Sequence, residues 1–390
     1  MTLSTLRLRN YADRPDAASA RLPATRVEVV PWQEATAGHS IVEWDALTQW
    51  TSCPNPFFES WYLLPALESF DPAGKVRLLR FEAEGVLAGL LPVAHDWRYY
   101  RHPLPQWSGW THANCFLGAP LVARGLEKPF WRALFEWADA HAGRALFLHL
   151  PDLPLTGPLH EAMLAVIAEQ RRPAALVRRE ERAMLASRLS PEDYLDQALS
   201  GKKRKELRRQ HARLSEQGEV RFERQLDTAG IHEWIEAFLW LEAQGWKGKA
   251  GSALAMEAET THLFAAALTA AAAKGRLERL TLSLDGAPVA MLANFITPPG
   301  AYSFKTAFDE RFARFSPGVL LQRENLALLS RAGIEWCDSC ASAEHPMIDH
   351  FWRERRAIGS VSIGIGGGAR RTLFRAIAWA ETGRLSGDIR

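Results

Sequence analysis

Residues 314–321 have the composition and order of an anion-binding helix start. Ser316 stands at the expected N-cap, Pro317 at the first helical position, and an apolar run begins at Val319. The first N–H groups of a helix lack partners within it, and its dipole favours negative charge there. Gly318 has no side chain, so an anion can approach the backbone closely. The segment predicts a phosphate site, with a plain helix cap as the alternative.

Candidate proton acceptors follow the expected strand Ile334–Asp338. Asp338 ends this strand and His345 lies in the loop after it, with Glu335 and Asp349 nearby. A general base needs only to accept one proton, directly or through water. We therefore take Asp338 and His345 as the candidate catalytic residues. The alternative for a buried strand-end carboxylate is hydrogen bonding to backbone N–H groups.

Cys337, Cys340, His345 and His350 have the spacing of a small zinc knuckle. Against this, an apolar strand runs directly into Cys337, and Glu344 stands where a knuckle normally has glycine. A redox CxxC would need a thioredoxin-like unit, which the surroundings do not suggest. We expect two cysteines at the end of a core strand, and no metal.

Two further pairs of side chains are candidates for substrate binding. Trp246 and Lys247 lie in a glycine-containing loop after an apolar helix, where they could cover a substrate or simply end the helix. Lys305 and Asp309 flank the end of the strand that precedes Ser316. They could face a cleft and orient substrate, or form a surface pair of little energetic value.

The segment 201–217 is a predicted basic helix. It contains seven Lys and Arg against Glu206 and Glu216, a charge of +5 with histidine neutral. Leu207 and Leu214 mark one narrow apolar face, which is typical of a solvated surface helix. The other interpretation is a patch that binds phosphates of coenzyme A or RNA. The absence of aromatic residues here argues against single-stranded RNA.

Composition predicts an ordinary globular protein of 390 residues. Hydrophobic residues make up 47% and charged residues 24%, and the net charge of +2 does not require a nucleic-acid partner. Four cysteines are too few for a disulfide framework. The longest small-apolar run, Phe264–Ala273, is too short to span a bilayer, and residues 1–24 lack the apolar core of a secretory signal. We expect a cytoplasmic protein without membrane insertion.

A β-hairpin occurs twice in the chain. Asp285-Gly286, a strong hairpin signal, joins the apolar runs Leu280–Leu284 and Val289–Ile296. Glu84-Gly85 and Leu87–Val93 stand 201 residues before Asp285-Gly286 and Pro288–Asn294. This weak repeat predicts two related domains.

Strands and helices alternate around these hairpins in both halves. The expected elements are listed in chain order: Arg26–Val30, Ile41–Trp50, Phe57–Ser69, the first hairpin, Cys115–Val122, Glu127–Ala142, Ala145–Leu150, Leu159–Arg171, Val220–Arg224, Ala229–Gln244, Glu257–Ala273, the second hairpin, Ala301–Phe308, Ser316–Ala332, Ile334–Asp338 and Ser360–Gly368. The pattern predicts mixed α/β sheets rather than a doubly wound parallel one. We expect a disordered tail at 1–24, domains at 25–184 and 185–380, and a tail at 381–390.

Four segments, in order, resemble an acetyltransferase-like family associated with cellulose and exopolysaccharide biosynthesis, which is related to the GNAT fold and to Fem-type aminoacyltransferases. They are Lys202–Arg213, Phe238–Lys249, Tyr302–Leu321 and the strand that ends at Asp338. The resemblance covers roughly Leu185–Gly366. It implies tandem GNAT-like domains, each a mixed, largely antiparallel sheet flanked by helices.

The resemblance also implies roles for particular residues. Backbone N–H groups at the helix start would hold the pyrophosphate of acyl-coenzyme A, while the acyl carbonyl pairs with a splayed strand edge at Ala290–Phe295 and an amine attacks it. The implied cofactor-binding residues are Arg314, Ser316, Pro317, Gly318, Val319 and Leu320. The chain departs from the family's loop, because Gly318 is displaced by one position and no second glycine follows. This departure leaves room for an aminoacyl donor of the Fem type.

The sequence and the resemblance together predict an N- or O-acyltransferase. It would move an acyl group from acyl-coenzyme A, a cosubstrate rather than a bound cofactor, to an amine or hydroxyl of a sugar or small metabolite. One alternative is a Fem-like transferase that uses aminoacyl-tRNA, bound through Lys202–Arg213. The other is a non-catalytic binding module in polysaccharide biosynthesis.

Overall fold

The computed structural model describes residues 23–343, 345 and 347–384, which form two compact units. The first contains the described residues up to Glu180 and from Ala357 onward, and the second is Glu181–Arg356. Most of the expected tails, at 1–22 and 385–390, lies outside the described residues. The division differs from the expected domains 25–184 and 185–380, because the strand that contains Ala357 pairs within the first unit.

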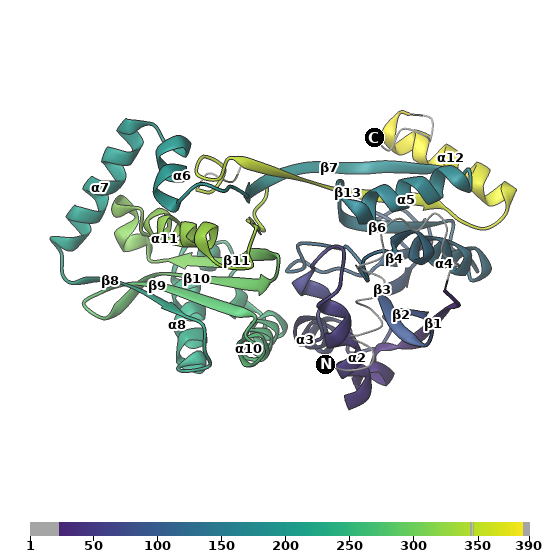
Figure 1. Cartoon of the computed structure of the whole chain (residues 1–390), viewed down its shortest axis with the longest axis horizontal. Coiled ribbons are helices and arrows are strands. Elements are labelled where there is room, and N and C mark those ends of the chain that lie inside the picture. Colours follow the sequence, from purple (N-terminus) through teal and green to yellow (C-terminus); the bar gives the residue numbers. More distant parts are fainter. Residues whose placement is uncertain (1–22, 344, 346, 385–390) are drawn as a thin grey trace. The chain divides into compact units, whose positions relative to one another are not determined.

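The first unit is a mostly antiparallel sheet with helices on both sides (Figure 1). Its strand order is β1-β2-β3-β4-β6-β13-β7, and the short β5 pairs with β3. The strands are β1 Thr25–Pro31, β2 Arg77–Ala83, β3 Val86–Asp96, β4 Gln106–Gly109, β5 Leu121–Val122, β6 Phe147–Pro154, β7 Ala174–Leu185 and β13 Glu354–Gly364. The helices are α2 Gly38–Thr48, α3 Ser60–Phe70, α4 Glu127–Ala140, α5 Pro158–Glu169 and α12 Gly368–Thr382, with 3₁₀ turns η1 Trp32–Thr36 and η2 Pro56–Phe58.

The second unit has the strand order β7-β12-β11-β10-β9-β8. Its own strands are β8 Val220–Gln225, β9 Leu277–Leu284, β10 Ala287–Thr297, β11 Gly300–Phe308 and β12 Trp336–Asp338. Its helices are α6 Pro191–Ala198, α7 Gly201–Ser215, α8 Ile231–Gln244, α9 Trp246–Lys249, α10 Ala258–Ala273 and α11 Pro317–Asn325, with 3₁₀ turns η3 Leu254–Met256, η4 Glu310–Phe315 and η5 Leu326–Ser330. Figure 1 shows α8 and α10 on one side of this sheet and α11 on the other.

The two hairpins are the same structure at the expected offset. The residue pairs Glu82↔Leu87 and Ser283↔Pro288 occupy equivalent positions in the two hairpins. In each hairpin the strand register shifts immediately after this pair. Both turns place two successive residues at positive φ, the conformation of a type I′ turn, which Gly85 and Gly286 adopt without strain. In each half the strand beside the hairpin, β4 or β11, runs antiparallel to the second hairpin strand. The strand beside that one, β6 or β12, runs parallel to it. The predicted fold class, tandem GNAT-like sheets flanked by helices, is confirmed.

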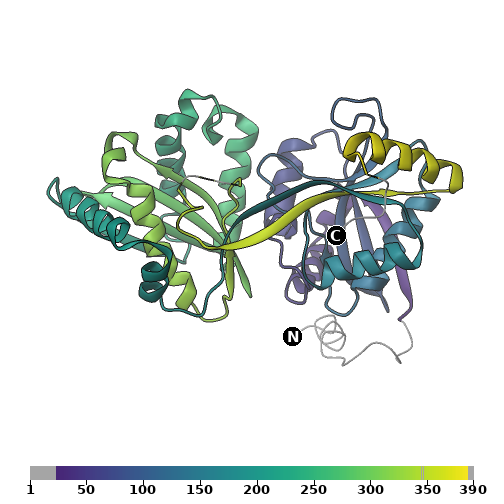
Figure 2. The same cartoon turned by 90° about the horizontal axis from the view of Figure 1, so that it is seen from above.

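Strands β7 and β13 each belong to both units. β7 begins in the first unit, and its end pairs with β12 of the second. β13 begins in the second unit and pairs with β6 of the first. The two strands lie side by side in both views (Figures 1 and 2). In the sheet, β6 of the first half is thus followed by β13, which comes from the end of the second half. Strand β12 of the second half is followed by β7, which comes from the end of the first half.

Several element boundaries differ from the expected ones. The helix expected at Ser316–Ala332 stops at Asn325 and continues as the 3₁₀ turn η5. The strand expected at Cys115–Val122 is only the two-residue β5, while β4, β7, α6 and α12 were not anticipated.

No helix in the described part of the chain combines the length and apolar character that crossing a bilayer would need.

Candidate functional site

The sheet of the second unit opens between β11 and β12. The two strands run parallel, but only Gly300–Tyr302 pairs with Trp336–Asp338. Beyond Tyr302, β11 continues to Phe308 and pairs with β10 on one side, with no strand on its other side among the described residues. Beyond Tyr302 this edge of β11 is not part of a strand ladder, and its Thr306 carbonyl lies 3.5 Å from Lys247 Nζ. Helix α11 begins nine residues after β11 ends.

The splayed edge is therefore not on β10, as the resemblance implied. Ala290–Phe295 is paired on both sides, with β9 and with β11, so its N–H and C=O groups are already in ladders. A strand in the middle of a sheet cannot pair with an acyl carbonyl. The assignment to Ala290–Phe295 is wrong, and the free edge lies on residues 303–308 of β11.

A pocket of about 600 Å³ lies at the start of α11. Its lining is Trp246, Phe308, Ala313, Ser316, Pro317, Gly318, Val319, His345 and Met347. The lining is mostly apolar, and its polar side-chain groups are the Ser316 hydroxyl, the His345 imidazole and the Trp246 indole N–H. Six residues that the sequence singled out for three different roles thus meet around one cavity.

The helix start has the predicted position but a different cap. Pro317 is its first residue, as expected, whereas Ser316 adopts the left-handed conformation (φ 51°, ψ 51°) and makes no side-chain capping bond. The Ser316 carbonyl accepts hydrogen bonds from the N–H groups of Val319 and Leu320. The Gly318 N–H has no acceptor within the described residues. It is the group that an anion would meet first.

Gly318 is also a point of close packing. A Cβ placed there would lie 3.0 Å from Met347 Sδ and 3.4 Å from a Phe308 ring carbon. The absent side chain therefore makes room both for the loop that contains Met347 and for an incoming ligand. Of the other expected donor-binding residues, Leu320 is buried in the core and Arg314 is exposed, with its guanidinium 4.6 Å from the centre of the Phe315 ring. Neither lines the pocket.

His345 lines the pocket and suits the role of a proton acceptor. Burial, and then the charge of Lys247, lower the pKa of its imidazole. Its Nδ1 is buried without a hydrogen-bond partner in the described structure. A lowered pKa keeps the imidazole neutral at neutral pH, and only the neutral ring can accept a proton.

Asp338, the other catalytic candidate, does not line the pocket. Its carboxylate is fully buried and lies 3.0 Å from Arg182 Nε and 2.9 Å from Arg356 Nη1, and it accepts a hydrogen bond from the Cys340 N–H. A carboxylate held by two guanidinium groups and an amide is an ion-pair centre. This geometry favours the structural alternative for Asp338.

The four substrate-binding candidates separate into two places. Trp246 is exposed and lines the pocket, whereas Lys247 turns inward, with Nζ 2.6 Å from Glu242 Oε1 and 3.5 Å from the Thr306 carbonyl. Lys305 lies on the free part of β11 and interacts electrostatically with Lys247 and Glu242. Asp309 instead caps η4 by accepting from the Arg311 N–H and guanidinium, which lowers the pKa of its carboxyl.

The sequence did not identify Phe308, Ala313 or Met347 as pocket residues. Phe308 and Ala313 flank predicted residues and could have been included by proximity. Met347 had no signal of its own, because only the folded loop brings it over α11. Cys337 and Cys340 are buried thiols, and no group of three or more potential metal ligands occurs among the described residues.

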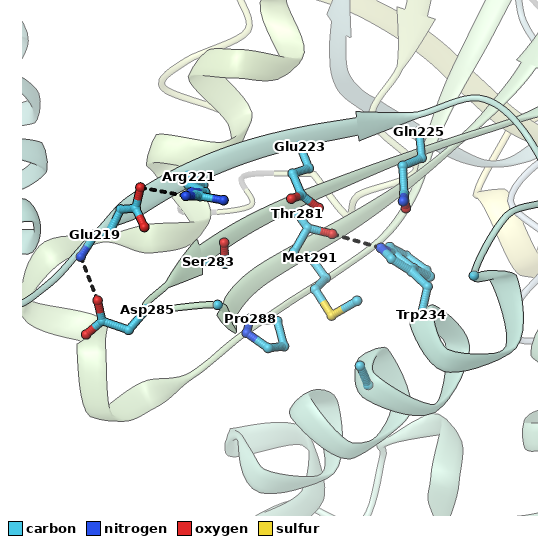
Figure 3. A pocket seen from close by; sticks show the side chains of 13 residues that line it. Glu219, Arg221, Glu223, Gln225, Trp234, Thr281, Ser283, Asp285, Pro288 and Met291 are labelled. Carbon is cyan, nitrogen blue, oxygen red and sulfur yellow. Dashed lines mark hydrogen bonds and ion pairs between the residues drawn. The ribbon is translucent and has the colours of Figure 1, made fainter.

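A second pocket, of about 490 Å³, lies beside the edge strand β8 (Figure 3). Its polar side chains are largely paired with one another. The Trp234 indole donates to Thr281 Oγ1 at 2.9 Å, Arg221 pairs with Glu219, and the Glu219 N–H donates to Asp285. None of the expected site residues lies there.

Comparison with known proteins agrees with this geometry. Residues 201–346 match the acetyltransferase (GNAT) domain family. The match lies within the second unit and contains α11, the free edge of β11 and His345. No curated protein sequence matches the chain.

Solved structures show the same fold over most of the chain. FemX covers 87% of this chain and 98% of its own, with 12% identity and a TM-score of 0.56. The C-terminal domain of a protein assigned as a lysylphosphatidylglycerol synthetase from Agrobacterium fabrum covers 89% and 98%, with 12% identity and a TM-score of 0.51. A conserved protein of unknown function from Bacteroides thetaiotaomicron covers 83% and 97%, with the same identity and TM-score. At these identities the likeness concerns the fold alone.

Proposed function

We propose that the second unit transfers an acyl group from acyl-coenzyme A to an amine or hydroxyl of a sugar or small metabolite. The observation that carries this proposal is the pocket where the opening between β11 and β12 meets the start of α11. The domain-family match supports the reaction class.

In this proposal the Gly318 N–H and the α11 dipole bind the donor pyrophosphate, and the apolar pocket holds the pantetheine arm. The free edge of β11 pairs with the donor amides. The acceptor nitrogen attacks the thioester carbonyl, so a C–N bond forms and the C–S bond breaks. His345 takes the proton that the amine loses, directly or through water, and the thiolate leaves to be protonated as coenzyme A.

Gly318→Glu tests the donor site. The new carboxylate would enter the space of the pyrophosphate and add repulsion, while glutamate is tolerated in the first turn of a helix. We expect the dissociation constant for acetyl-coenzyme A to rise more than tenfold, roughly 1.4 kcal/mol, by calorimetric titration.

Gly368→Glu is the control for the added charge alone, because a side chain at Gly318 would also lie 3.0 Å from Met347 Sδ. Gly368 also begins a helix, α12, and a side chain there meets no atom within 4 Å. It adds the same charge far from the pocket in the sequence and in the other unit, so affinity should not change. An unchanged dissociation constant in a folded Gly318→Glu protein would place the donor elsewhere and overturn the proposal.

A Fem-like transferase that uses aminoacyl-tRNA is the second candidate, and the exposed cations of α7 favour it. Lys202, Lys203, Lys205, Arg208 and Arg213 are exposed and have no ion-pair partner in the described structure. Binding of tRNA with loss of acetyl-coenzyme A binding would favour this candidate. Binding of neither would favour a non-catalytic module in polysaccharide biosynthesis.

A further inference from the structure

Strand β8 is the last strand of its sheet. It pairs with β9 on one side, and no strand pairs with its other side among the described residues. The Asp285 N–H donates to the Glu219 carbonyl at 2.9 Å, and in an antiparallel ladder such bonds recur at every second residue. The residues between them direct their N–H and C=O groups to the open edge: they are Val220, Phe222 and Arg224. No described residue bonds to these backbone groups.

Charged side chains of opposite sign flank the middle of this edge. Arg221 and Glu223 project from β8 on the side of the second pocket (Figure 3), and both are exposed. Phe222, between them, is half-buried on the other face, where its ring stacks on His211 of α7 with the ring centres 5.9 Å apart. The order along the strand is therefore cation, aromatic residue, anion.

Both ends of β8 are held in place by other elements. At its start, the Glu219 N–H donates to Asp285 Oδ1 at 2.8 Å. At its end, the Arg224 guanidinium donates to the Glu324 carbonyl at 2.8 Å and pairs with the buried carboxylate of Glu278. A strand that is already ordered loses little conformational entropy when it gains a partner.

Exposed charges on an edge strand usually prevent it from pairing with another chain. Here their order has the opposite effect when two copies of β8 meet antiparallel with Phe222 opposite Phe222. Arg221 of each copy then stands opposite Glu223 of the other. These positions form non-hydrogen-bonded pairs, in which the side chains are closest and opposite charges stabilise the contact. The two Phe222 residues exchange backbone hydrogen bonds, and Val220 exchanges them with Arg224.

Neighbouring antiparallel registers bring like charges together. A register centred on Arg221 places Arg221 opposite itself and Glu219 opposite Glu223. A register centred on Glu223 places Glu223 opposite itself. Like charges directly opposite each other are destabilising. Of these registers, the one centred on Phe222 is the one in which every cross-strand charge pair is favourable.

We propose that the open edge of β8 binds a second copy of this chain, so that two chains form a dimer through antiparallel β8 strands centred on Phe222. The contact is isologous: each edge is used once, and the assembly closes as a dimer instead of extending into a filament. A contact between two short strands is a small interface, so we expect a reversible dimer whose population depends on concentration. This dimer does not depend on the proposed acyl transfer.

Sedimentation equilibrium over a wide range of protein concentrations measures this dimer. Arg221→Glu brings carboxylates together at both cross-strand pairs, and Glu223→Arg brings guanidinium groups together there. Each change should raise the dimer dissociation constant by about tenfold or more. Both side chains are exposed, so each variant should fold. Glu236→Arg is the control, because it makes the same charge change at an exposed position of α8 and should leave the dimer unchanged.

Mixing the two variants tests the register directly. When an Arg221→Glu chain meets a Glu223→Arg chain, each cross-strand pair again joins a carboxylate to a guanidinium. The mixture should therefore form a heterodimer, although neither variant associates with itself. One chain that carries both changes should form a homodimer again. In the wild-type protein, amide hydrogen exchange within residues 219–225 should slow as the concentration rises, because the N–H groups of the open edge become bonded.

A wild-type chain that stays monomeric at every concentration reached would overturn the proposal. A dimer that persists unchanged in folded Arg221→Glu and Glu223→Arg proteins would also overturn it, because another surface would then form the contact. An equal loss of the dimer in Glu236→Arg would show a general effect of charge and contradict a specific role for β8. If the wild type dimerises and the mixed variants do not associate, pairing of β8 about Phe222 is wrong.

Discussion

Asp338 and His149 occupy equivalent positions in the two halves. Asp338 pairs with Tyr302 on the fourth strand of its half, and His149 pairs with Ser108 on the fourth strand of the other. The chemistry differs: His149 Nδ1 is 3.0 Å from Ser362 Oγ, and burial lowers the pKa of its ring to about 4. One buried position thus holds an ion-pair centre in one half and a neutral imidazole in the other.

Asp338→Asn should destabilise the fold rather than abolish the chemistry. It leaves the guanidinium groups of Arg182 and Arg356 buried without their carboxylate. Breaking a buried ion pair costs about 3–5 kcal/mol, which denaturant unfolding would measure. Glu310→Gln, at a largely exposed pair, should cost less than about 0.5 kcal/mol. A variant of normal stability without transfer activity would instead restore Asp338 as a catalytic residue.

His345 should set the acid limb of the pH profile. Its pKa is lowered from the ordinary 6.5, so the neutral, proton-accepting form predominates at neutral pH and disappears as the pH falls through the lowered pKa. We expect kcat to be constant near pH 7 and to fall only at a lower pH. His345→Gln should reduce kcat by about 10²-fold or more and remove this limb. A profile that keeps its acid limb in His345→Gln would assign the proton acceptor to another group.

At the scale of elements, α7 has an apolar face that packs on the core and a basic face that is exposed. Leu207 and Leu214 are buried in the core of the second unit, and the Ser200 hydroxyl accepts from the Lys203 N–H at the helix start. Arg204 is held by Asp196 on the flank of the helix. With the apolar face occupied, only the basic face is available to a partner.

Lys202, Lys205 and Arg213 are the α7 side chains for a charge-reversal test. All three are exposed and unpaired within the described structure. Replacement of all three by glutamate should change the melting temperature little, because solvated charges contribute little to stability. Affinity for tRNA or polyphosphate should fall and lose its salt dependence. The control is Arg375→Glu, an exposed cation on α12; equal losses in the two proteins would contradict a specific role for α7.

The sequence predicted some elements well and others poorly for physical reasons. The hairpins were predictable because Asp285-Gly286 and its counterpart specify both the turn and the strand register. Strand β7 was not, because Arg178–Arg182 places five charged residues in succession at its centre, with no alternating apolar face. The helix start at Pro317 was predictable from local chemistry, whereas the Met347 loop, the free edge of β11 and the Lys247–Glu242 pair depend on tertiary contacts.

At the scale of the whole molecule, the two halves differ where a donor would bind. Helix α4 follows the fourth strand of the first half as α11 follows that of the second. Glu127 is the first residue of α4, and its buried carboxylate accepts hydrogen bonds from its own N–H, from the Gly125 N–H and from Ser52. A carboxyl group of the chain itself thus interacts with backbone N–H groups at the start of α4, whereas at the start of α11 the Gly318 N–H has no acceptor within the described residues.

We therefore expect one donor site per chain. Titration with acetyl-coenzyme A should give a stoichiometry of one, and Gly318→Glu should remove it without revealing a second. Glu127→Gln, which removes this charge from the first unit, should leave donor binding to the second unit unchanged. A stoichiometry of two would contradict this asymmetry.

The exchange of β7 and β13 has a consequence for synthesis on the ribosome. Strand β6 receives its partner β13 only when residues up to Gly364 have been made, some 200 residues after β6 itself. Until then the nascent first unit exposes a strand edge, which is a template for unwanted pairing. A chain cut between Glu180 and Glu181 would likewise separate β6 from its partner, so the two products are not independent folding units. The two halves are alike in structure, yet the first cannot be completed before the second has been made.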